Sequence, residues 1–286
     1  MERKIDIVIP YVDNTDRVWR KAYYDYCKYH NLQNKIVDLH TERYEDIGLI
    51  NYQLKLINKH MPWVNRIFLL LMNREQAPRN LPNNVVIIYH AQFIPQKFLP
   101  TFNSCTIEMF LWNIKDLGEY FIYANDDMLP FRDLSEDDFF TRDNHVKINW
   151  WQEDIRELRT VFRQQCINSY QNVMFRLGRK FDSNVYIRPE HSMTPMIKSH
   201  CVETYKLLED VIIRHIRAFR TTYQFNQYIY PIFEKVVYGT YDTTIDFLYT
   251  QLGEEIDLNY QIVCINLVPK KQEKKLLELL EKAICE

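Results

Sequence analysis

Glycine is scarce in this chain. Only 5 glycines occur in 286 residues, and none of them belongs to a Gly-x-Gly-x-x-Gly or Walker pattern. Glycine-rich loops of those kinds let the backbone wrap closely around a phosphate group. Their absence argues against a classical dinucleotide site and against a P-loop ATP site. A bound phosphate must therefore be held by side chains and a metal ion.

Long apolar runs are also missing. The longest run, Ile67 to Met72, is far shorter than the roughly 20 residues of a membrane-spanning helix, and no apolar segment follows the charges at the N-terminus. We therefore expect no transmembrane segment and a cytoplasmic protein, with peripheral contact at the inner face of the membrane as its closest approach to a bilayer. The 6 cysteines form no Cys-x-x-Cys pair and no zinc-like pattern with histidine, which predicts reduced thiols.

No excess of basic residues is present either, because 36 Lys and Arg stand against 38 Asp and Glu. Domains that bind nucleic acid usually carry a clear positive excess, so we expect no nucleic-acid partner. Apolar and aromatic residues are plentiful, at 47% and 14% of the chain. That content predicts a globular protein with a substantial core.

The order of the predicted elements indicates an α/β fold. Strands that alternate with helices at this spacing favour a Rossmann-like, mixed and mostly parallel sheet with helical additions. Strands are expected over residues 4–12, 66–72, 85–89, 121–124 and 261–267, and helices over 19–30, 47–61, 106–114, 202–219, 223–237 and 270–284.

We expect a single catalytic domain over residues 1–286, with its core in 1–145 and 185–268. Residues 146–184 are polar and aromatic, and we expect them to form a helical elaboration on the sheet. Residues 269–286 form an amphipathic C-terminal helix. Packing of that helix on the domain is favoured over binding of a partner helix.

Two adjacent carboxylates follow the strand predicted over 121–124. In an open α/β sheet, the carboxyl ends of the strands border the ligand crevice, so Asp126 and Asp127 would lie where a substrate binds. Carboxylate oxygens suit Mg²⁺ or Mn²⁺ carrying a phosphate. The alternative for an isolated Asn-Asp-Asp is an ordinary turn that caps the next helix.

Four blocks of the chain resemble the Stealth family, which includes capsular-polysaccharide phosphotransferases and the lysosomal-enzyme N-acetylglucosamine-1-phosphotransferase. The first block is Ile5 to Asp13. The long second block runs from Arg43 through Leu99-Pro100-Thr101-Phe102-Asn103-Ser104 to Asn125-Asp126-Asp127. The third contains His191 to Met196, Phe219, Arg220 and Asn226, and the fourth is Cys264-Ile265-Asn266.

The resemblance implies a fold similar to nucleotide-sugar transferases of the GT-A type. It also implies transfer of hexose-1-phosphate from a nucleotide diphosphosugar, expected to be a UDP-sugar, to a hydroxyl of a glycan or polysaccharide acceptor. The products are a phosphodiester and a nucleoside monophosphate, made in capsular or surface polysaccharide synthesis. Asp126 and Asp127 are the implied ligands of Mg²⁺ or Mn²⁺.

The same resemblance assigns roles to other residues. Arg220 would stabilise charge on the transferred phosphoryl group, His191 would act as the base towards the acceptor hydroxyl, and Asp127 would take part in the chemistry. The implied substrate-binding residues are Asp13, Asn103, Ser104, Glu108, Arg217 and Asn226.

Each of these residues also has a structural interpretation. Arg214, Arg217 and Arg220 recur every three residues and would line roughly one face of a helix, which is equally typical of a solvated stripe. An isolated histidine such as His191 is more often structural than catalytic. Asn103 and Ser104 suit the cap of the next helix, a role that can coexist with ligand binding.

Two other functions fit the same residues. A conventional metal-dependent glycosyltransferase would use the acidic pair but break the bond between sugar and oxygen, releasing a nucleoside diphosphate. A non-catalytic carbohydrate-binding relative would have lost activity through departures from the family pattern, among them Pro10, Asn14 and Met193.

Overall fold

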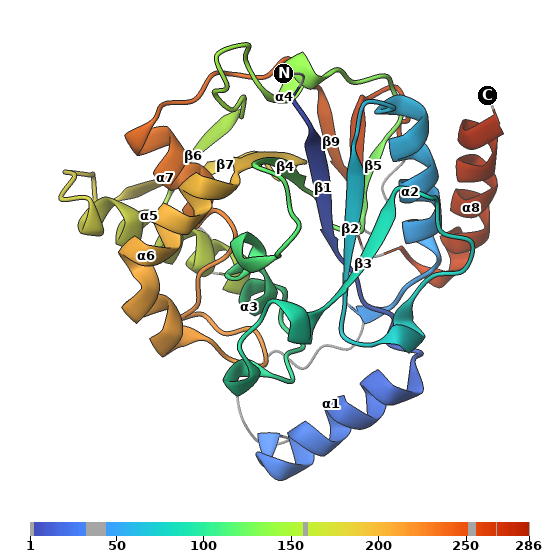
Figure 1. The fold of residues 1–286 in the computed structure, drawn as a ribbon, viewed down its shortest axis with the longest axis horizontal. Coiled ribbons are helices and arrows are strands. Elements are labelled where there is room, and N and C mark those ends of the chain that lie inside the picture. The colour runs from blue at the N-terminus through green and yellow to red at the C-terminus, as the bar shows by residue number, and fades with distance from the viewer. Residues whose placement is uncertain (1–2, 33–43, 157–159, 251–255, 267, 286) are drawn as a thin grey trace.

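The computed structural model describes residues 3–32, 44–156, 160–250, 256–266 and 268–285. The central sheet consists of β1 (Ile5–Pro10), β2 (Arg66–Leu71), β3 (Val85–Tyr89), β4 (Tyr120–Tyr123) and β8 (Thr194–Ile197). Their order is β3-β2-β1-β4-β8 (Figure 1). Four strands run parallel, and β8 runs antiparallel to β4. The prediction of an α/β fold with a mixed, mostly parallel sheet is confirmed.

Both faces of this sheet are apolar, because the buried strands are runs of apolar residues and successive residues point to opposite sides. The face that contains Ile7 packs against α2 (Leu49–His60). The face that contains Val8 packs against three helices. These helices are α5 (Val161–Arg176), α6 (Lys198–His215) and α7 (Ile229–Val237).

Two smaller sheets flank the central one. β5 (Met128–Pro130), β10 (Ile262–Ile265) and β9 (Phe247–Thr250) form a three-stranded sheet in the order β5-β10-β9. β6 (Trp150–Asp154) and β7 (Val185–Pro189) form an antiparallel pair. The remaining helices are α1 (Arg17–Tyr29), α3 (Ser104–Glu108) and α4 (Glu136–Phe139), with 3₁₀ turns η3 (Arg74–Gln76), η4 (His90–Gln92), η5 (Gln96–Phe98) and η6 (Leu111–Asn113).

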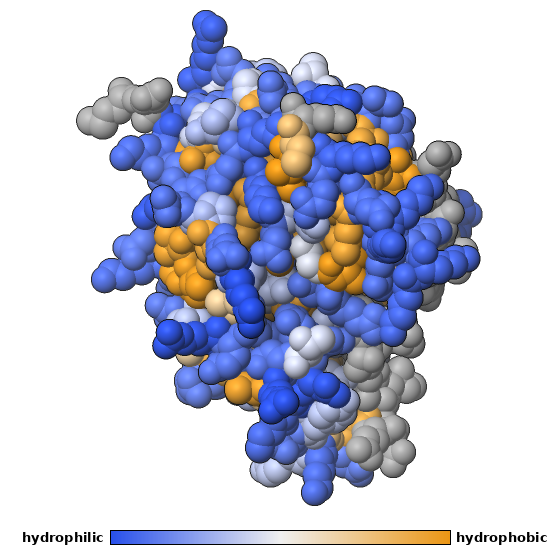
Figure 2. All heavy atoms as spheres, turned by 90° about the vertical axis from the view of Figure 1, so that its right-hand side faces the viewer, coloured by the Kyte–Doolittle hydropathy of each residue, from blue (hydrophilic) through white to orange (hydrophobic). Residues whose placement is uncertain are grey.

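The C-terminal helix α8 (Lys270–Cys285) lies beside α2 (Figure 1). Its Leu276 and Leu280 are buried in one cluster with Leu56 of α2, so the expected packing of this helix on the domain is confirmed. Figure 2 shows that the face on this side of the molecule is largely hydrophilic, with apolar side chains in separate patches. Within the described ranges, every helix is too short or too polar to span a bilayer.

Besides the helix expected over 223–237, which begins only at Ile229, three local predictions are wrong. The helix expected over 106–114 ends at Glu108 and is followed by a 3₁₀ turn, because most of its residues are buried and tertiary packing decides their backbone. The segment expected to be helical over 146–184 contains α5 but also β6. Its Trp150 and Trp151 are residue types that favour strands.

The third correction concerns the arginine-rich helix. α6 ends at His215, so Arg217 and Arg220 lie beyond it and do not share a helix face with Arg214. The guanidinium of Arg217 donates to the carbonyl oxygens of Arg214 and Ile216, at 2.9 and 2.7 Å. These carbonyls lie at a helix end, where no further turn satisfies them, and a basic side chain there closes the helix.

Candidate active site

One cavity of about 1170 Å³ opens at the carboxyl ends of β1 and β4. In the sheet, β2 lies on one side of β1 and β4 lies on the other. The loops that follow β1 and β4 therefore leave neighbouring strands at a topological switch point. Pro10 to Val12 line the cavity after β1, and Asn125 to Asp127 line it after β4. The crevice predicted from the acidic pair is therefore present.

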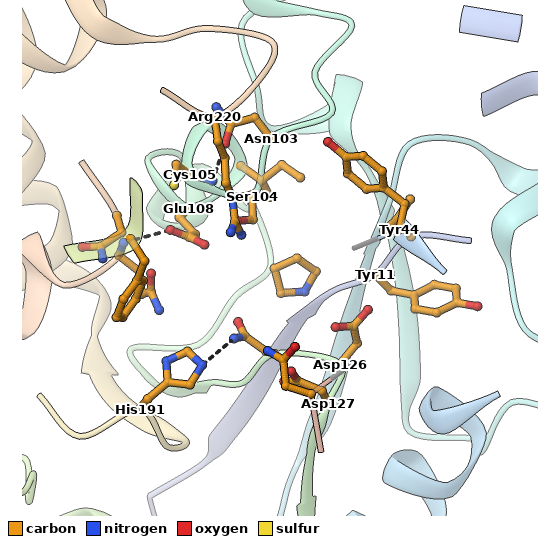
Figure 3. Close-up of a pocket in the computed structure, with 18 of the residues that line it drawn as sticks. Tyr11, Tyr44, Asn103, Ser104, Cys105, Glu108, Asp126, Asp127, His191 and Arg220 are labelled. Atoms are coloured by element: carbon orange, nitrogen blue, oxygen red, sulfur yellow. Dashed lines mark hydrogen bonds between the residues drawn. The ribbon is translucent and has the colours of Figure 1, made fainter. Parts of the chain in front are cut away.

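The turn that carries the acidic pair is held from both sides. The buried Gln53 of α2 donates from its amide nitrogen to the carbonyl oxygens of Asn125 and Met128, at 2.6 and 2.7 Å. The backbone N–H of Ile265 in β10 donates to the carbonyl oxygen of Asp127 at 2.9 Å. The two carboxylates therefore project into the cavity from a fixed backbone, as Figure 3 shows.

Burial shapes the charge of these carboxylates. It raises the pKa of Asp127 to about 6. It raises the pKa of Asp126 well above its ordinary value, with further contributions from the charges of Asp127 and Asp46. One carboxylate oxygen of Asp127, Oδ1, is buried and has no hydrogen-bond partner. A cation beside this pair would remove the electrostatic cost of keeping both groups ionised.

Asp46 is a third carboxylate of the cavity, and the sequence analysis did not single it out. Its Oδ2 accepts from the Tyr11 hydroxyl at 2.7 Å, and its Oδ1 accepts from the backbone N–H of Gly48 at 2.8 Å. Burial raises its pKa. The available signal was weak, because Asp46 precedes Gly48 at the start of α2 and resembles a turn residue.

The donor set fits a divalent cation that takes part of its coordination from a ligand. Among the residues that the structure describes, no three His, Cys, Asp or Glu side chains come together as a metal cage. Mg²⁺ is usually bound through one or two carboxylates together with water and substrate phosphates. Asp126 and Asp127, with the unpartnered Oδ1, match that smaller set.

The opposite wall of the cavity carries a positive charge. Arg220 donates from Nη2 to the Ser104 hydroxyl at 2.5 Å, and both side chains line the cavity (Figure 3). The charge of Arg220 acts to lower the pKa of Asp126, Asp127 and Glu108. Arg220 is thus close to the acidic pair and to Glu108, and it forms no ion pair with any of these three carboxylates.

Glu108 and Asn103 hold this wall in place. Burial raises the pKa of Glu108, which accepts the backbone N–H of Gln227 at 2.9 Å and the Tyr123 hydroxyl at 3.1 Å. Asn103 caps α3 through the backbone N–H of Cys105 at 3.1 Å, and it donates to the carbonyl oxygen of Arg217 at 3.0 Å. Asn103 therefore has the expected capping role and also lines the cavity.

His191 lies across the cavity from Arg220, in a defined hydrogen-bond chain (Figure 3). Its Nδ1 is 2.9 Å from the Tyr228 hydroxyl, and its Nε2 is 3.5 Å from the amide nitrogen of Asn125. The Tyr123 hydroxyl is also 2.9 Å from the amide oxygen of Asn125, and the amide nitrogen of Asn125 faces His191. In the tautomer that has its proton on Nδ1, the imidazole donates to the Tyr228 hydroxyl and Nε2 is the acceptor.

The imidazole of His191 is neutral at ordinary pH. Burial lowers its pKa to about 4, and the positive charges of Arg188 and Arg220 act in the same direction. A neutral ring with an unprotonated Nε2 is able to accept a proton from a ligand hydroxyl. Asn125 and Tyr228 are the hydrogen-bond partners of this ring, and neither was assigned a role from the sequence.

The other predicted residues are placed less centrally. Asn226 lines the cavity, but it is buried and bonded to Ser169 and Cys166. Asp13 and Arg217 are not among the lining residues. Asp13 accepts from the backbone N–H of Thr15 at 2.7 Å, and Arg217 closes α6. Substrate binding by Asp13, Arg217 and Asn226 stays a prediction.

Comparison with known proteins places these residues in a family context. Residues 43–148 match the family model described as Stealth protein CR2, conserved region 2. The chain carries the second conserved region of the Stealth proteins. This region includes Asn103, Ser104, Glu108 and the acidic pair, and the resemblance drawn from the sequence is confirmed.

Curated proteins of two bacteria illustrate the relationship. The capsular polysaccharide phosphotransferase LcbA of Neisseria meningitidis is 29% identical over 229 residues, which are 78% of this chain and 62% of that protein. The exopolysaccharide phosphotransferase cps2G of Lactiplantibacillus plantarum is 35% identical over 148 residues, 50% of this chain and 41% of that protein. The chain thus spans less than two thirds of the length of these relatives.

Among solved structures, an active-site mutant of LgtC aligns with 97% of this chain and 95% of its own, at 11% identity and a TM-score of 0.40. A likeness this distant carries nothing about the reaction.

Proposed function

We propose that the cavity transfers hexose-1-phosphate from a nucleotide diphosphosugar to a hydroxyl of a glycan. One observation carries the proposal: a single cavity brings together a strand-end carboxylate pair, the guanidinium of Arg220 and the neutral imidazole of His191. These are a place for a cation, a fixed positive charge and a base. The names of the relatives, capsular and exopolysaccharide phosphotransferases, support the same reaction class.

The donor diphosphate would lie between the acidic pair and Arg220. Asp126 and Asp127 would hold a divalent cation, Mg²⁺ or Mn²⁺, which when bound neutralises charge on the diphosphate. Arg220 would donate to the phosphoryl oxygens on the other side, where charge develops during transfer. Ser104 keeps the guanidinium oriented, because its hydroxyl accepts one of the guanidinium N–H groups.

The acceptor hydroxyl would approach from the side of His191. Its oxygen attacks the phosphorus next to the sugar, and its proton passes to Nε2 of His191. The bond between that phosphorus and the oxygen that bridges the two phosphates breaks. The nucleoside monophosphate leaves with the bridging oxygen, and the product is a phosphodiester. Tyr228 holds the imidazole through Nδ1, and the acceptor hydroxyl would replace the long 3.5 Å contact between Nε2 and the Asn125 amide nitrogen.

The proposal extends to a UDP-sugar donor, a glycan acceptor in capsular or surface polysaccharide synthesis, and action in the cytoplasm at the inner face of the membrane. The carboxylates and Arg220 recognise the diphosphate, which all nucleotide sugars share. The identity of the base and of the sugar is therefore a matter for a screen.

The test is a screen of nucleotide sugars by thermal shift, with Mg²⁺ and with a chelator, followed by chromatography of the nucleotide product. A donor at 100 times its Kd should stabilise the protein by about 2.7 kcal/mol. The proposal predicts a shift that needs the cation, and a nucleoside monophosphate as product. Release of nucleoside diphosphate alone would assign a glycosyltransferase, and binding without turnover would assign a non-catalytic relative.

A further inference from the structure

Three aromatic side chains line the cavity, and two of them lie against His191. Trp151 of β6 is 51% exposed and lines the cavity, although an indole usually gains from burial. Phe162 of α5 and Tyr249 of β9 line it as well. The rings of Phe162 and Tyr249 each lie 5.7 Å from the imidazole of His191. We call Trp151, Phe162 and Tyr249 the aromatic wall.

Trp151 is held on a rigid support. It lies directly opposite Arg188 in the β6–β7 pair, so the two side chains share one face of the hairpin. The Arg188 guanidinium lies 5.8 Å from the indole ring. Glu153, on the same face, accepts from Arg188 Nη2 at 2.6 Å and from Nε at 2.8 Å, and it is also bonded to the Tyr186 hydroxyl.

This support leaves a flat apolar surface beside fixed polar groups. The Arg188 side chain is only 16% exposed, whereas the indole that it supports is open to the cavity. Glu190, which lies between Arg188 and His191 in the sequence, lines the cavity as well. A ligand that rests on the aromatic wall would thus meet a carboxylate and a guanidinium at its edge.

A sugar ring has the matching chemistry. The C–H groups on one face of a pyranose form a flat apolar patch, which suits the negative face of an aromatic ring, while hydroxyls project from its edge. Binding sites of this kind combine apolar walls with a few placed polar groups. A nucleotide base would also stack on aromatic rings. A base bound at the aromatic wall, however, would bring the donor diphosphate to Arg220 and the metal ion from the side that the acceptor hydroxyl has to occupy.

The opposite end of the cavity is available for the nucleotide. Tyr11 and Tyr44 lie there, on the far side of the acidic pair from His191 (Figure 3). A donor placed with its diphosphate at Asp126 and Asp127 would therefore extend towards these tyrosines. The space beside His191 remains for the second substrate.

We propose that the aromatic wall, with Arg188 and Glu190, is the acceptor subsite and binds a pyranose ring of a glycan. This inference rests on the proposed function for the role of the bound sugar as acceptor. It assigns Trp151 and Tyr249 as the residues that stack on the ring and place one of its hydroxyls at Nε2 of His191.

Saturation-transfer NMR tests the subsite without a donor. The probes are methyl α-D-glucopyranoside, methyl β-D-galactopyranoside and methyl N-acetyl-β-D-glucosaminide. At least one of them should receive saturation at its C–H protons from the parent protein. Trp151→Ala and Tyr249→Ala should each weaken this binding by roughly tenfold, whereas Trp151→Phe should retain most of it, because a smaller ring still stacks.

Phe175→Ala is the matched control, because Phe175 is 75% exposed on α5 but does not line the cavity. It should bind like the parent. Failure of all three glycosides to receive saturation, or full binding by the Trp151→Ala and Tyr249→Ala variants, would overturn the subsite. Circular dichroism and the Trp151→Phe variant separate loss of the ring from loss of the fold.

The donor screen keeps the two proposals distinct. Glycoside binding that depends on Trp151, in a protein that neither binds nor cleaves any nucleotide sugar, would retain the sugar subsite and reject the proposed transfer. Cleavage of a nucleotide sugar to a monophosphate, with glycoside binding unaffected by either substitution, would do the reverse.

Discussion

At the scale of single residues, burial of the acidic turn after β4 lowers the stability of the metal-free protein against unfolding. Burial raises the pKa of Asp127 to about 6, so the folded, metal-free protein binds a proton there more readily than the unfolded chain. Stability against unfolding therefore rises as the pH falls through about 6, and at higher pH the ionised carboxylate opposes folding. The full effect is on the order of 3 kcal/mol.

We predict that Asp127→Asn abolishes transfer and raises the melting temperature of the metal-free protein at about pH 7.5. The gain should shrink towards about pH 4.5, where the parental carboxyl is protonated in the folded state. Calorimetry in a chelator at both pH values measures this. Mg²⁺ should then stabilise the parent more than the variant.

A variant that melts well below the parent at the higher pH, or that transfers at the parental rate, would contradict the assigned role of Asp127. Asp133→Asn is a suitable control, because the Asp133 side chain is 91% exposed and lies outside the cavity lining. Its metal response should equal that of the parent.

Arg220 supplies the fixed positive charge of the site. We predict that Arg220→Ala raises the barrier to transfer by about 2.7 to 4 kcal/mol, the range found when one donor to a developing negative charge is removed. Single-turnover kinetics with saturating donor measures the effect. Arg214→Ala is the control, because Arg214 is exposed at the end of α6 and is not a lining residue. Equal rates for the two variants would show that Arg220 has no part in the chemistry.

We assign His191 the role of the base that accepts the proton of the acceptor hydroxyl. We predict that His191→Ala slows transfer by about 10² to 10⁴-fold, the usual contribution of a positioned base. Donor affinity should survive, because the donor contacts lie at Arg220 and the acidic pair. Rates across about pH 3 to 9, a range that includes the pKa of about 4 of His191, check this, with His30→Ala as an exposed control just after α1. Turnover within a few-fold of the parent with the same pH profile would make His191 structural.

At the scale of elements, the sequence predicts the four parallel strands of the central sheet well but not the antiparallel strand β8. β3 begins and ends at the predicted residues, and β1, β2 and β4 lie within a few residues of theirs. These strands are short apolar runs bounded by polar residues, and a run that is buried on both faces depends little on distant contacts. The acidic pair is found from the same pattern, because its place follows from the end of β4.

Elements whose structure depends on tertiary contacts are not predicted. β6 is recognisable only with its partner β7, which lies more than 30 residues later. The end of α6 depends on the bonds that Arg217 makes to backbone carbonyls. For the same reason Asp46, Asn125 and Tyr228 were not singled out, since their roles come from side chains of other segments.

Asp6 connects several segments at the amino ends of the parallel strands, which is the edge of the sheet remote from the cavity. It is fully buried in β1 and accepts from the guanidinium of Arg66 at 3.0 Å, the amide of Asn65 at 2.7 Å and the backbone N–H of Gly118 at 2.8 Å. In Asp6→Asn the charge is lost and an amide nitrogen replaces one carboxylate oxygen, so Arg66 Nη2 and the backbone N–H of Gly118 lose their acceptor. Removal of one partner of a buried ion pair typically costs about 3 to 5 kcal/mol.

We therefore predict that Asp6→Asn lowers the free energy of unfolding by about 3 kcal/mol, since Arg66 is partly exposed and water satisfies part of it. Urea denaturation measures the loss. The kcat of the folded fraction should remain at the parental value, because Asp6 is not a cavity residue. A stable variant with reduced kcat would contradict this division between the two edges of the sheet.

At the scale of the whole molecule, the cavity is a product of the fold rather than of any one segment. The loops after β1 and β4, the start of α3, the β6–β7 pair and the strands β9 and β10 all contribute lining residues. The matched family region ends at residue 148, before Trp151 and His191. The proposed acceptor side is thus built from residues outside that matched region.

The bond that breaks is the central claim, and an ¹⁸O label between C1 of the sugar and the adjacent phosphorus reports it directly. The donor is a nucleotide sugar identified in the screen, and ³¹P NMR locates the label after reaction with an acceptor or with water. Sugar-phosphate transfer predicts that the label stays between the sugar and the phosphorus of the product, with unlabelled nucleoside monophosphate released. Label found on a released nucleoside diphosphate would contradict the proposal and assign the cavity to glycosyl transfer.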